Sequence, residues 1–530
     1  MSHESSIARR VWIAGLCLFA PLAALGATGD RVTIDSGALQ GAVADEVISF
    51  KGVPFAQPPL GTLRWKPPQA VAKWQGVREA TSYGADCMQE PFPGDAAPLG
   101  VTPKEDCLYL NVWRPEKAAG AQLPVMVWIY GGGFVNGGGS PAVYDGSQFA
   151  KDGIVLVSFN YRLGKLGFFA HPALSAEQPG FPAVNYALMD QVAALQWVQR
   201  NIAAFDGDPH NVTIFGESAG GGSVHMLLLS PLATGLFQKA IIESGGGRPG
   251  GPGGKSLAGA EASGVALAKK HGIEGQGAEV LAKLREIPAE QLKLNMTMMG
   301  DETYSGGPVV DGKLNLGTPT AQYAAGKGAK VPVMVGANSA DIGFAPGKTV
   351  DEVFAVFGPD ADRARAVYNP DHSTDIRAVG GKVGGDLTMI EPAREIARLL
   401  SKRGQPVYEY RFSYVAESLR GKLPGALHAT EIPFVFDTVA ARYGKDLTAA
   451  DAAAAKAMHK YWVAFAKTGK PDPAGEPAWP AYDARNDQIM DFTNKGPVAG
   501  PDPWKARMDL VAALSERHEH SSPPTAARRP

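Results

Sequence analysis

The chain has 530 residues, of which 45% are hydrophobic and 20% are charged, so it can bury a large core and lacks the compositional bias of disordered or fibrous proteins. Its formal net charge of −2 at pH 7 gives no support for a nucleic-acid or membrane-surface partner, because both usually need a clustered basic face. The composition therefore predicts a globular protein and gives no reason to expect that it binds nucleic acid or a membrane surface.

The N-terminus has the pattern of an export signal. Two arginines precede an apolar run at 11–24, which ends in small residues that suit a signal peptidase. The alternative is a membrane anchor, but a span needs about 20 apolar residues, whereas this run is shorter and contains Pro21. We expect residues 1–26 to be a signal peptide and the mature chain to be periplasmic or secreted, with no stable membrane anchor.

Export changes how the three cysteines are interpreted. Cys17 leaves with the signal peptide, and Cys87 and Cys107 remain as the only pair in an oxidising compartment, which predicts a disulfide. Two free buried thiols are the alternative. Neither cysteine has a second Cys or a His at ligand spacing, so no metal site is expected.

Apolar runs with β-branched residues recur through the middle of the chain. Their hydrophobicity is continuous rather than alternating, which indicates strands covered on both faces. Between them, the segment 187–205 repeats apolar residues at steps of three and four, as an amphipathic helix does. These patterns predict one doubly wound, largely parallel α/β sheet. The predicted strands are 123–130, 153–161, 212–215, 237–244, 331–336 and 406–414.

We expect a single domain over residues 27–515. Within it, the helix-rich stretch 256–325 is predicted to be an insertion that builds one wall of a pocket. The glycine-rich segment 245–255 is predicted to be a loop near the C-terminal end of a strand, where ligands gather in open α/β sheets. The last residues, 516–530, are Pro-rich and basic and predict a disordered tail.

The pentapeptide "GESAG", centred on Ser218, directly follows a predicted strand and precedes a helix-like segment. Its flanking glycines relieve the crowding of a sharp strand-to-helix turn, which would lift Ser218 out of the sheet as a nucleophile. Because a serine hydroxyl is a poor nucleophile, it needs a base, an acid and donors for the developing oxyanion. The alternative is a glycine-rich turn whose serine only caps the following helix.

A second glycine-rich turn, "YGGGF", follows the predicted strand at 123–130. Glycines let bare backbone N–H groups approach a substrate oxygen closely. We expect the N–H groups of Gly132 and Gly133, with that of Ala219 after the nucleophile, to form an oxyanion hole. The alternative is a strand that ends in glycines for structural reasons alone.

The chain resembles the type-B carboxylesterases, the branch of the α/β-hydrolases that includes the cholinesterases. The resemblance covers roughly residues 30–510, and it includes the blocks "FKGVPFAQPPLGTLRWKPP", "EDCLYLNVWRP", "NYRLGKLGFF", "MDQVAALQWVQRNIAAFDGDPHNVTIFGESAGG" and "LHATEIPFVF" in the order of the family. It implies an α/β-hydrolase fold, a large and mostly parallel sheet with helices on both faces, and the hydrolysis of carboxylic esters.

The order of the chain selects the base, because α/β-hydrolases place serine, acid and histidine in that sequence. His428, in "LHATEIPFVF", comes after the last predicted strand and matches the histidine block of the family. His459 is the other late candidate, but it sits in an Ala-rich helical stretch and is interpreted as a helix surface residue.

The acid is expected in "GANSADIGF", after the predicted strand at 331–336, where Asp341 is the only carboxylate. The family usually has glutamate here, and the shorter aspartate requires a slightly different loop to reach the histidine. Asp351 and Glu352 are the alternatives.

Three further residues match family positions near the site: Glu217, Ser244 and Glu431. A structural hydrogen bond is at least as good an explanation for each, so they are not placed in the catalytic set. Arg248, in the glycine-rich loop, is interpreted as a solvated surface charge rather than as a ligand for a substrate carboxylate.

The predicted reaction is acyl transfer to water through an acyl-enzyme, with no cofactor and no metal, on a small-molecule ester. The cholinesterases, which the chain resembles, carry a tryptophan in the loop closed by the first disulfide, where its ring binds a quaternary ammonium. The segment between Cys87 and Cys107 contains no tryptophan, so the resemblance does not imply choline-ester specificity. Hydrolysis of an amide or carbamate is the first alternative. The second is a non-catalytic binding protein, which the retention of Ser218, Asp341 and His428 argues against.

Overall fold

The computed structural model describes residues 29–521, apart from 91, 93, 119, 180–183, 250–254 and 297–305. The predicted signal peptide lies outside the described residues. None of the helices in this part of the chain combines the length and the apolar character that a membrane span needs.

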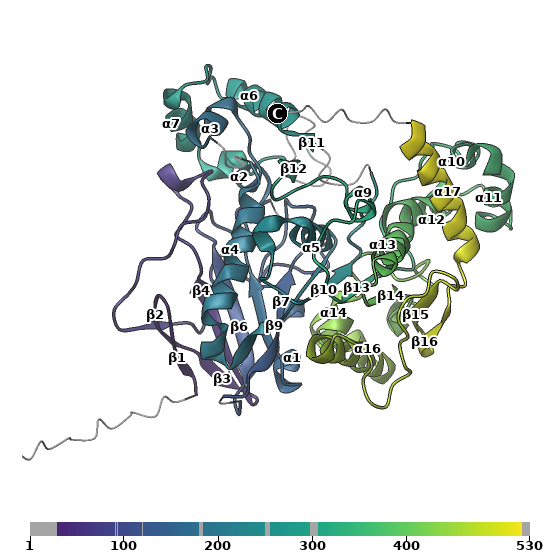
Figure 1. Ribbon diagram of the computed structural model, residues 1–530, viewed down its shortest axis with the longest axis horizontal. Helices are drawn as coiled ribbons and strands as arrows, with labels where there is room; N and C mark the ends of the chain where they lie inside the picture. The colour runs from purple at the N-terminus through teal and green to yellow at the C-terminus, as the bar shows by residue number, and fades with distance from the viewer. Residues whose placement is uncertain are drawn as a thin grey trace, which may run out of the picture.

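A sheet of eleven strands runs through the middle of the described structure (Figure 1). Seven neighbouring strands, from β15 to β8, pair in parallel, and antiparallel strands complete the sheet at both edges. The prediction of one large, mostly parallel sheet is therefore confirmed. In spatial order the strands are β16 (Gly496–Pro501), β15 (Gln488–Thr493), β14 (Val407–Phe412), β13 (Val333–Asn338), β10 (Lys239–Glu243), β9 (Gly207–Glu217), β7 (Leu123–Ile129), β8 (Val155–Phe159), β6 (Tyr109–Pro115), β4 (Val47–Pro54) and β3 (Ala42–Ala44).

Each of the six predicted strands overlaps an observed one. The largest difference is in β9, which begins at Gly207, whereas the prediction begins at 212. The polar residues of its first half carry no hydrophobic signal, but this stretch already pairs with β7, where Leu123 lies opposite Gly207. Two small sheets lie outside the main one: β1 (Arg31–Ile34), β2 (Gly37–Gln40) and β5 (Val77–Glu79) form the first, and β11 (Lys255–Ser256) and β12 (Val309–Val310) form the second.

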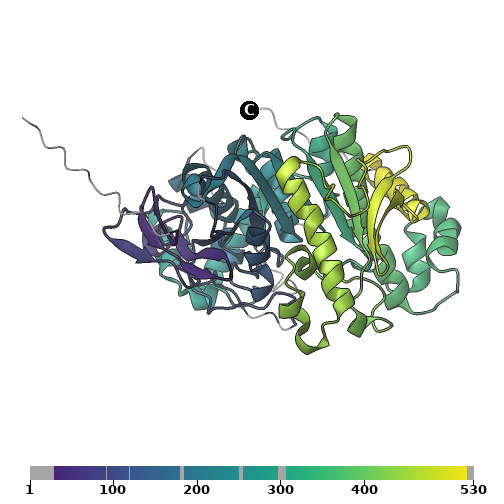
Figure 2. The ribbon, with the colours of Figure 1, turned by 90° about the horizontal axis from the view of Figure 1, so that it is seen from below.

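Helices cover both faces of the main sheet (Figures 1 and 2). Helix α5 packs on β9 and β10, and α13 packs on β13 and β14, on one face. On the other face α16 crosses β7 and β9, and it stands in front of the strands in Figure 2. The helices are α1 (Ser147–Lys151), α2 (Gly164–Gly167), α3 (Pro172–Glu177), α4 (Tyr186–Asn201), α5 (Ala219–Leu229), α6 (Leu257–Lys270), α7 (Ala278–Glu286), α8 (Ala289–Leu292), α9 (Pro319–Ala324), α10 (Val350–Ala355), α11 (Ala361–Tyr368), α12 (Ile376–Gly385), α13 (Glu391–Lys402), α14 (Ile432–Val435), α15 (Val439–Tyr443), α16 (Ala449–Thr468) and α17 (Lys505–Ser521).

The C-terminal helix differs from the sequence prediction. Helix α17 continues to Ser521, so it enters the range 516–530 that the sequence predicted to be a disordered tail. Its apolar side chains Leu510, Val511 and Leu514 are buried in a separate small core with residues of α10, α11 and α12. The Pro-rich composition that suggested disorder begins only after this helix, outside the described residues.

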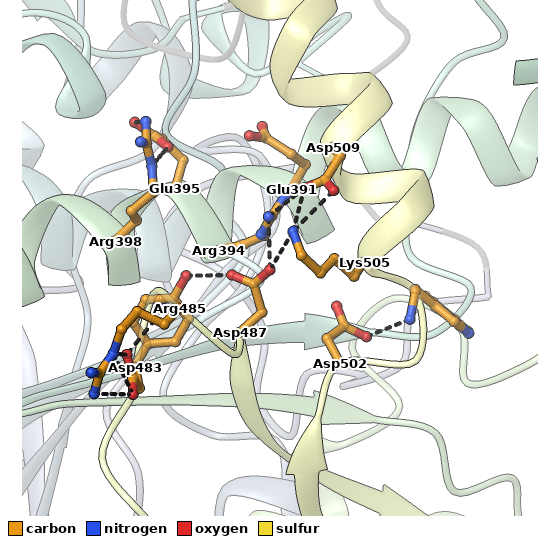
Figure 3. A network of polar contacts seen from close by, with 12 residues as sticks. Glu391, Arg394, Glu395, Arg398, Asp483, Arg485, Asp487, Asp502, Lys505 and Asp509 are labelled. Atoms are coloured by element: carbon orange, nitrogen blue, oxygen red, sulfur yellow. Dashed lines mark hydrogen bonds and ion pairs between the residues drawn. The ribbon is translucent and has the colours of Figure 1, made fainter. Parts of the chain in front are cut away.

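Charged side chains tie α17 to the body of the protein (Figure 3). Arg394, on α13, donates from Nη2 to Asp487 Oδ2 at 2.8 Å and to Asp509 Oδ1 at 2.6 Å. Lys505 Nζ lies 3.2 Å from Asp487 Oδ2 and 2.9 Å from Asp509 Oδ2. Because only 2% of the Asp487 side chain is exposed, its charge depends on these partners.

We expect Arg394→Met to lower the stability by about 3 kcal/mol, because removal of one partner leaves a buried carboxylate poorly compensated. The measurement is Tm by calorimetry at a fixed scan rate. Arg485→Met is the matched control, since its partner is Asp483 and 88% of the Arg485 side chain is exposed. The control should keep the parent Tm, and equal shifts for the two variants would contradict the structural role of Arg394.

Candidate active site

Ser218 occupies a sharp turn between β9 and α5. Strand β9 ends at Glu217, α5 begins at Ala219, and Ser218 between them has φ 58° and ψ −122°. This conformation is costly for a residue with a side chain, and such strain is found mainly at functional sites. The turn also needs Gly220, because a Cβ there would lie 1.9 Å from the carbonyl oxygen of Ile129 on the neighbouring strand.

The structure brings Ser218, His428 and Asp341 together. His428 Nε2 lies 2.8 Å from Ser218 Oγ, and His428 Nδ1 lies 2.6 Å from Asp341 Oδ1. Asp341 follows β13, and His428 lies between β14 and α14, so both residues come after neighbouring parallel strands. The Asp341 side chain is fully buried, whereas 21% of the His428 side chain is exposed.

The carboxylate of Asp341 is held by several donors. Ser244 Oγ donates to Oδ2 at 2.7 Å, the Asn338 N–H donates to Oδ2 at 2.8 Å, and the Ile342 N–H donates to Oδ1 at 2.7 Å. Burial alone would raise the pKa of Asp341, but the charge of His428 and these hydrogen bonds outweigh it and lower the pKa. Asp341 therefore stays ionised and fixes the His428 tautomer in which Nδ1 carries the proton.

Asn338 is a site residue that the sequence reasoning missed. Besides its backbone bond to Asp341, its side-chain Nδ2 donates to the Leu427 carbonyl at 2.7 Å and to Glu431 Oε2. It thus joins the loop of Asp341 to the loop of His428. The only signal in the sequence is its place three residues before Asp341, and the motif "GANSADIGF" does not show which of its residues turn inward.

Three buried glutamates lie around His428 and Ser218. Glu217 Oε1 lies 3.2 Å from His428 Nε2, and burial raises the pKa of Glu217 well above its usual range. Burial also raises the pKa of Glu431 to about 8, and the charge of Glu243 raises it further. Burial raises the pKa of Glu243 to about 8, although Trp462 Nε1 donates to it at 2.8 Å. The site therefore contains carboxyl groups that resist ionisation.

Nearby carboxyl groups act on His428. Burial lowers its pKa, but the negative charge that Glu217 carries when it is ionised and the charge of Asp341 outweigh this effect and raise the pKa. The electrostatics of the site thus favour a positively charged imidazole. That is the form His428 reaches after it takes a proton.

The glycine-rich turn after β7 lies against Ser218. A Cβ on Gly131 would lie 2.9 Å from the Ser218 Cβ, so the two turns are in contact. Gly132 and Gly133 have φ values of +96° and +63°. Within the described part of the chain their N–H groups donate to no acceptor, and Ala219 begins α5, where the first N–H groups of a helix have no partner inside it.

Comparison with known proteins places the chain in a family. The Carboxylesterase family matches residues 28–367 and 361–502. The chain belongs to the carboxylesterase family. It is 37% identical over 496 residues to fumonisin B1 esterase of Sphingopyxis macrogoltabida, a match that covers 89% of this chain and 88% of the relative. It is 35% identical over 496 residues to para-nitrobenzyl esterase of Bacillus subtilis (strain 168), with 88% and 95% coverage.

This assignment establishes the reaction class. With a family match over most of the chain and esterases among its relatives, the protein is a carboxylic ester hydrolase with the α/β-hydrolase fold. The alternative of a non-catalytic binding protein is therefore set aside. The carboxylesterase also contains the predicted disulfide between Cys87 and Cys107. Among the described residues no group of three or more His, Cys, Asp or Glu side chains is arranged to hold a metal ion.

Two sequence interpretations of this carboxylesterase were wrong. His459 is not a helix surface residue, because it is only 2% exposed, lies with Nδ1 2.7 Å from the Val435 carbonyl oxygen and packs against Phe149. Arg248 is not a solvated charge, because its guanidinium forms a buried ion pair with Glu391. In both cases tertiary packing buried a residue whose local sequence is polar or rich in small residues.

The alternative acids lie away from the histidine. Asp351 pairs with Arg365 at 2.7 Å on the surface, and Glu352 accepts the Lys348 N–H at 2.7 Å near the start of α10. Of the three carboxylates considered from the sequence, the structure places only Asp341 on His428.

Proposed function

We propose that Ser218 is the nucleophile of this ester hydrolase, His428 its general base and Asp341 the acid that orients the base. The observation that carries the proposal is the continuous chain of short contacts from Asp341 through His428 to Ser218. The strained backbone of Ser218 and the buried, ionised Asp341 support the same assignment. We assign the oxyanion hole to the N–H groups of Gly132, Gly133 and Ala219.

The reaction proceeds in two acyl-transfer steps. Ser218 Oγ attacks the ester carbonyl carbon as its proton moves to His428 Nε2, and the carbonyl oxygen becomes an oxyanion that the N–H donors stabilise. His428 then gives this proton to the leaving alkoxide, which departs as the alcohol and leaves the acyl-enzyme. A water molecule, deprotonated by His428, attacks the acyl-enzyme in the same way and releases the carboxylic acid with free Ser218.

The surroundings of the acid and the base favour an ester with an apolar group. Ile342 and Phe344 follow Asp341 and are 40% and 74% exposed, and Leu427 precedes His428 and is 36% exposed. Exposed large apolar side chains beside a site are typical of substrate contacts. The two relatives are named as esterases of different compounds, so their names support a small-molecule ester without selecting one.

We also propose that the mature protein is exported. The buried disulfide and the sequence of residues 1–26 support this assignment. Mass spectrometry of the protein recovered outside the cytoplasm should find an N-terminus at residue 27, and recovery of the full-length chain from the cytoplasm alone would contradict export.

The assignment of Ser218 is tested with short-chain 4-nitrophenyl esters. The parent should release a burst of nitrophenol equal to its active sites, followed by steady turnover, because the acyl-enzyme accumulates when its hydrolysis is slow. Ser218→Ala should show neither phase.

In the same assay Asp341→Asn should lower kcat by about 10⁴, because the histidine then loses its tautomer control. Asp351→Asn is the matched control and should keep the parent rate; a burst from Ser218→Ala would refute the proposal.

The pH profile of kcat/KM tests the electrostatics of the site. His428 must be neutral to accept the Ser218 proton, so activity rises as pH passes upward through its pKa. The charge of Glu217 raises that pKa, and Glu217→Gln removes it. We therefore expect the acid limb of the profile to move to lower pH in this variant.

Glu243→Gln is the matched control, because Glu243 is equally buried but is not one of the main charges that raise the pKa of His428. Its acid limb should stay at the parent position. An unshifted acid limb in Glu217→Gln would show that Glu217 carries a proton throughout the pH range of activity. The expected effect of Glu217 on the pKa of His428 would then be wrong.

A further inference from the structure

The polypeptide that follows the glycine-rich turn is held by the segment around Cys87. The side chain of Gln89 pairs with the backbone of Gly137 at two points: Oε1 accepts the Gly137 N–H at 2.9 Å, and Nε2 donates to the Gly137 carbonyl at 2.6 Å. Nε2 also donates to the Cys87 carbonyl at 2.9 Å, so the amide is held by the backbone of its own segment as well. Gln89 is only 4% exposed, so water competes little for these bonds.

The residue before Gly137 connects this anchor to the turn. The Asn136 N–H donates to the Gly132 carbonyl at 2.9 Å, and Asn136 Nδ2 donates to the Glu90 carbonyl at 2.7 Å. Gly132 adopts φ +96°, and a Cβ there would lie 2.4 Å from the Asn136 carbonyl oxygen. The backbone of Gly132 therefore rests directly on Asn136, which in turn is bonded to the segment that carries Gln89.

Asp86 gives the same segment a second hold on the loop. Its Oδ1 accepts the Gly139 N–H at 3.0 Å, and its Oδ2 accepts the Ser140 hydroxyl. The next residue, Cys87, is joined to Cys107 by the disulfide. The segment 86–90 thus contacts the loop 136–140 along its length, and the disulfide ties the segment to the main sheet just before β6.

We propose that Gln89 is a positioning residue for ester hydrolysis, which holds the turn of Gly132 and Gly133 where their N–H groups meet the oxyanion. The inference rests on the proposed function, because it takes those N–H groups as the donors. Gln89 bonds to the backbone of 87 and 137 and acts only through the loop. Misplacement of a site by 1 Å can cost about a hundredfold in rate, and a donor to the oxyanion acts on the transition state rather than on bound substrate.

The test compares Gln89→Met with the parent. Methionine has a similar length and removes all four hydrogen bonds of the amide, including the 3.5 Å bond that Oε1 accepts from Asn136 Nδ2. Gln405→Met is the matched control, because Gln405 is also nearly buried and donates from Nε2 to two backbone carbonyls, those of Ala329 and Val331, outside the loop. For each protein we would measure kcat and KM with 4-nitrophenyl butyrate, Tm, and Ki for an alkyl trifluoromethyl ketone, whose adduct with Ser218 carries an oxyanion.

We expect Gln89→Met to lower kcat by about tenfold or more, to leave KM within about threefold, and to raise Ki by a factor similar to the loss in kcat/KM. Gln405→Met should keep the parent kcat and Ki even if its Tm falls as far as that of Gln89→Met. The proposal is overturned if kcat and Ki of Gln89→Met stay within about twofold of the parent, if only KM changes, or if the control loses as much activity. Where Gln89→Met does not fold, Gln89→Glu keeps the acceptor for the Gly137 N–H, loses the donor, and is judged by the same criteria.

Ser218→Ala is measured beside these variants so that the two proposals fail separately. If Ser218→Ala still hydrolyses the ester, the assignment of the nucleophile is wrong whatever Gln89 does. If Ser218→Ala is inactive and Gln89→Met behaves as the parent, the proposed function stands and the role of Gln89 is refuted.

Discussion

The backbone of Ser218 is the constraint on which the site depends. A serine at φ 58° and ψ −122° between a strand and a helix is strained, and it persists only where its surroundings leave no alternative. Those surroundings are the parallel strands. The Ser218 N–H donates to the Glu243 carbonyl at the end of β10, and Gly220 lies against β7. The sheet therefore holds the turn from both sides.

The order of the strands assembles the remaining parts. Parallel strands end at one edge, so the loops after β7, β9, β13 and β14 meet there, although they lie far apart in the sequence. These loops supply the glycine-rich turn, the serine, the acid and the histidine. Four separate motifs thus become one site because of a single property of the sheet, and the small movements of each loop are limited by side chains that reach across, such as Asn338 and Gln89.

This division explains what the sequence could predict. Some predictions rest on patterns within one segment, such as the apolar strand runs and the glycines around Ser218, and six observed strands agree with those runs. Others rest on the order of residues along the chain, and the contacts among Ser218, Asp341 and His428 agree with that order. Side chains that bond to distant backbone leave no such pattern. Gln89 meets a loop 48 residues away, and it has no periodicity that could reveal this contact. His459 was misread for the same reason, because the Ala-rich helix gave no sign of which face is buried.

Asp341 has a short side chain, and backbone contacts between its loop and the loop of His428 bring its carboxylate within reach of the imidazole. Aspartate is one methylene shorter than the glutamate expected at this position, so the two loops must approach more closely. Ala340 and Leu427, which directly precede Asp341 and His428, pair as a β-bridge, and the Ala340 N–H donates to the Ala426 carbonyl at 2.8 Å. Asn338 adds its side-chain bond to the Leu427 carbonyl. Because these bonds fix the backbone on both sides, the short carboxylate meets His428 at 2.6 Å without a longer side chain, and the acid requires its loop partners as much as its own chemistry.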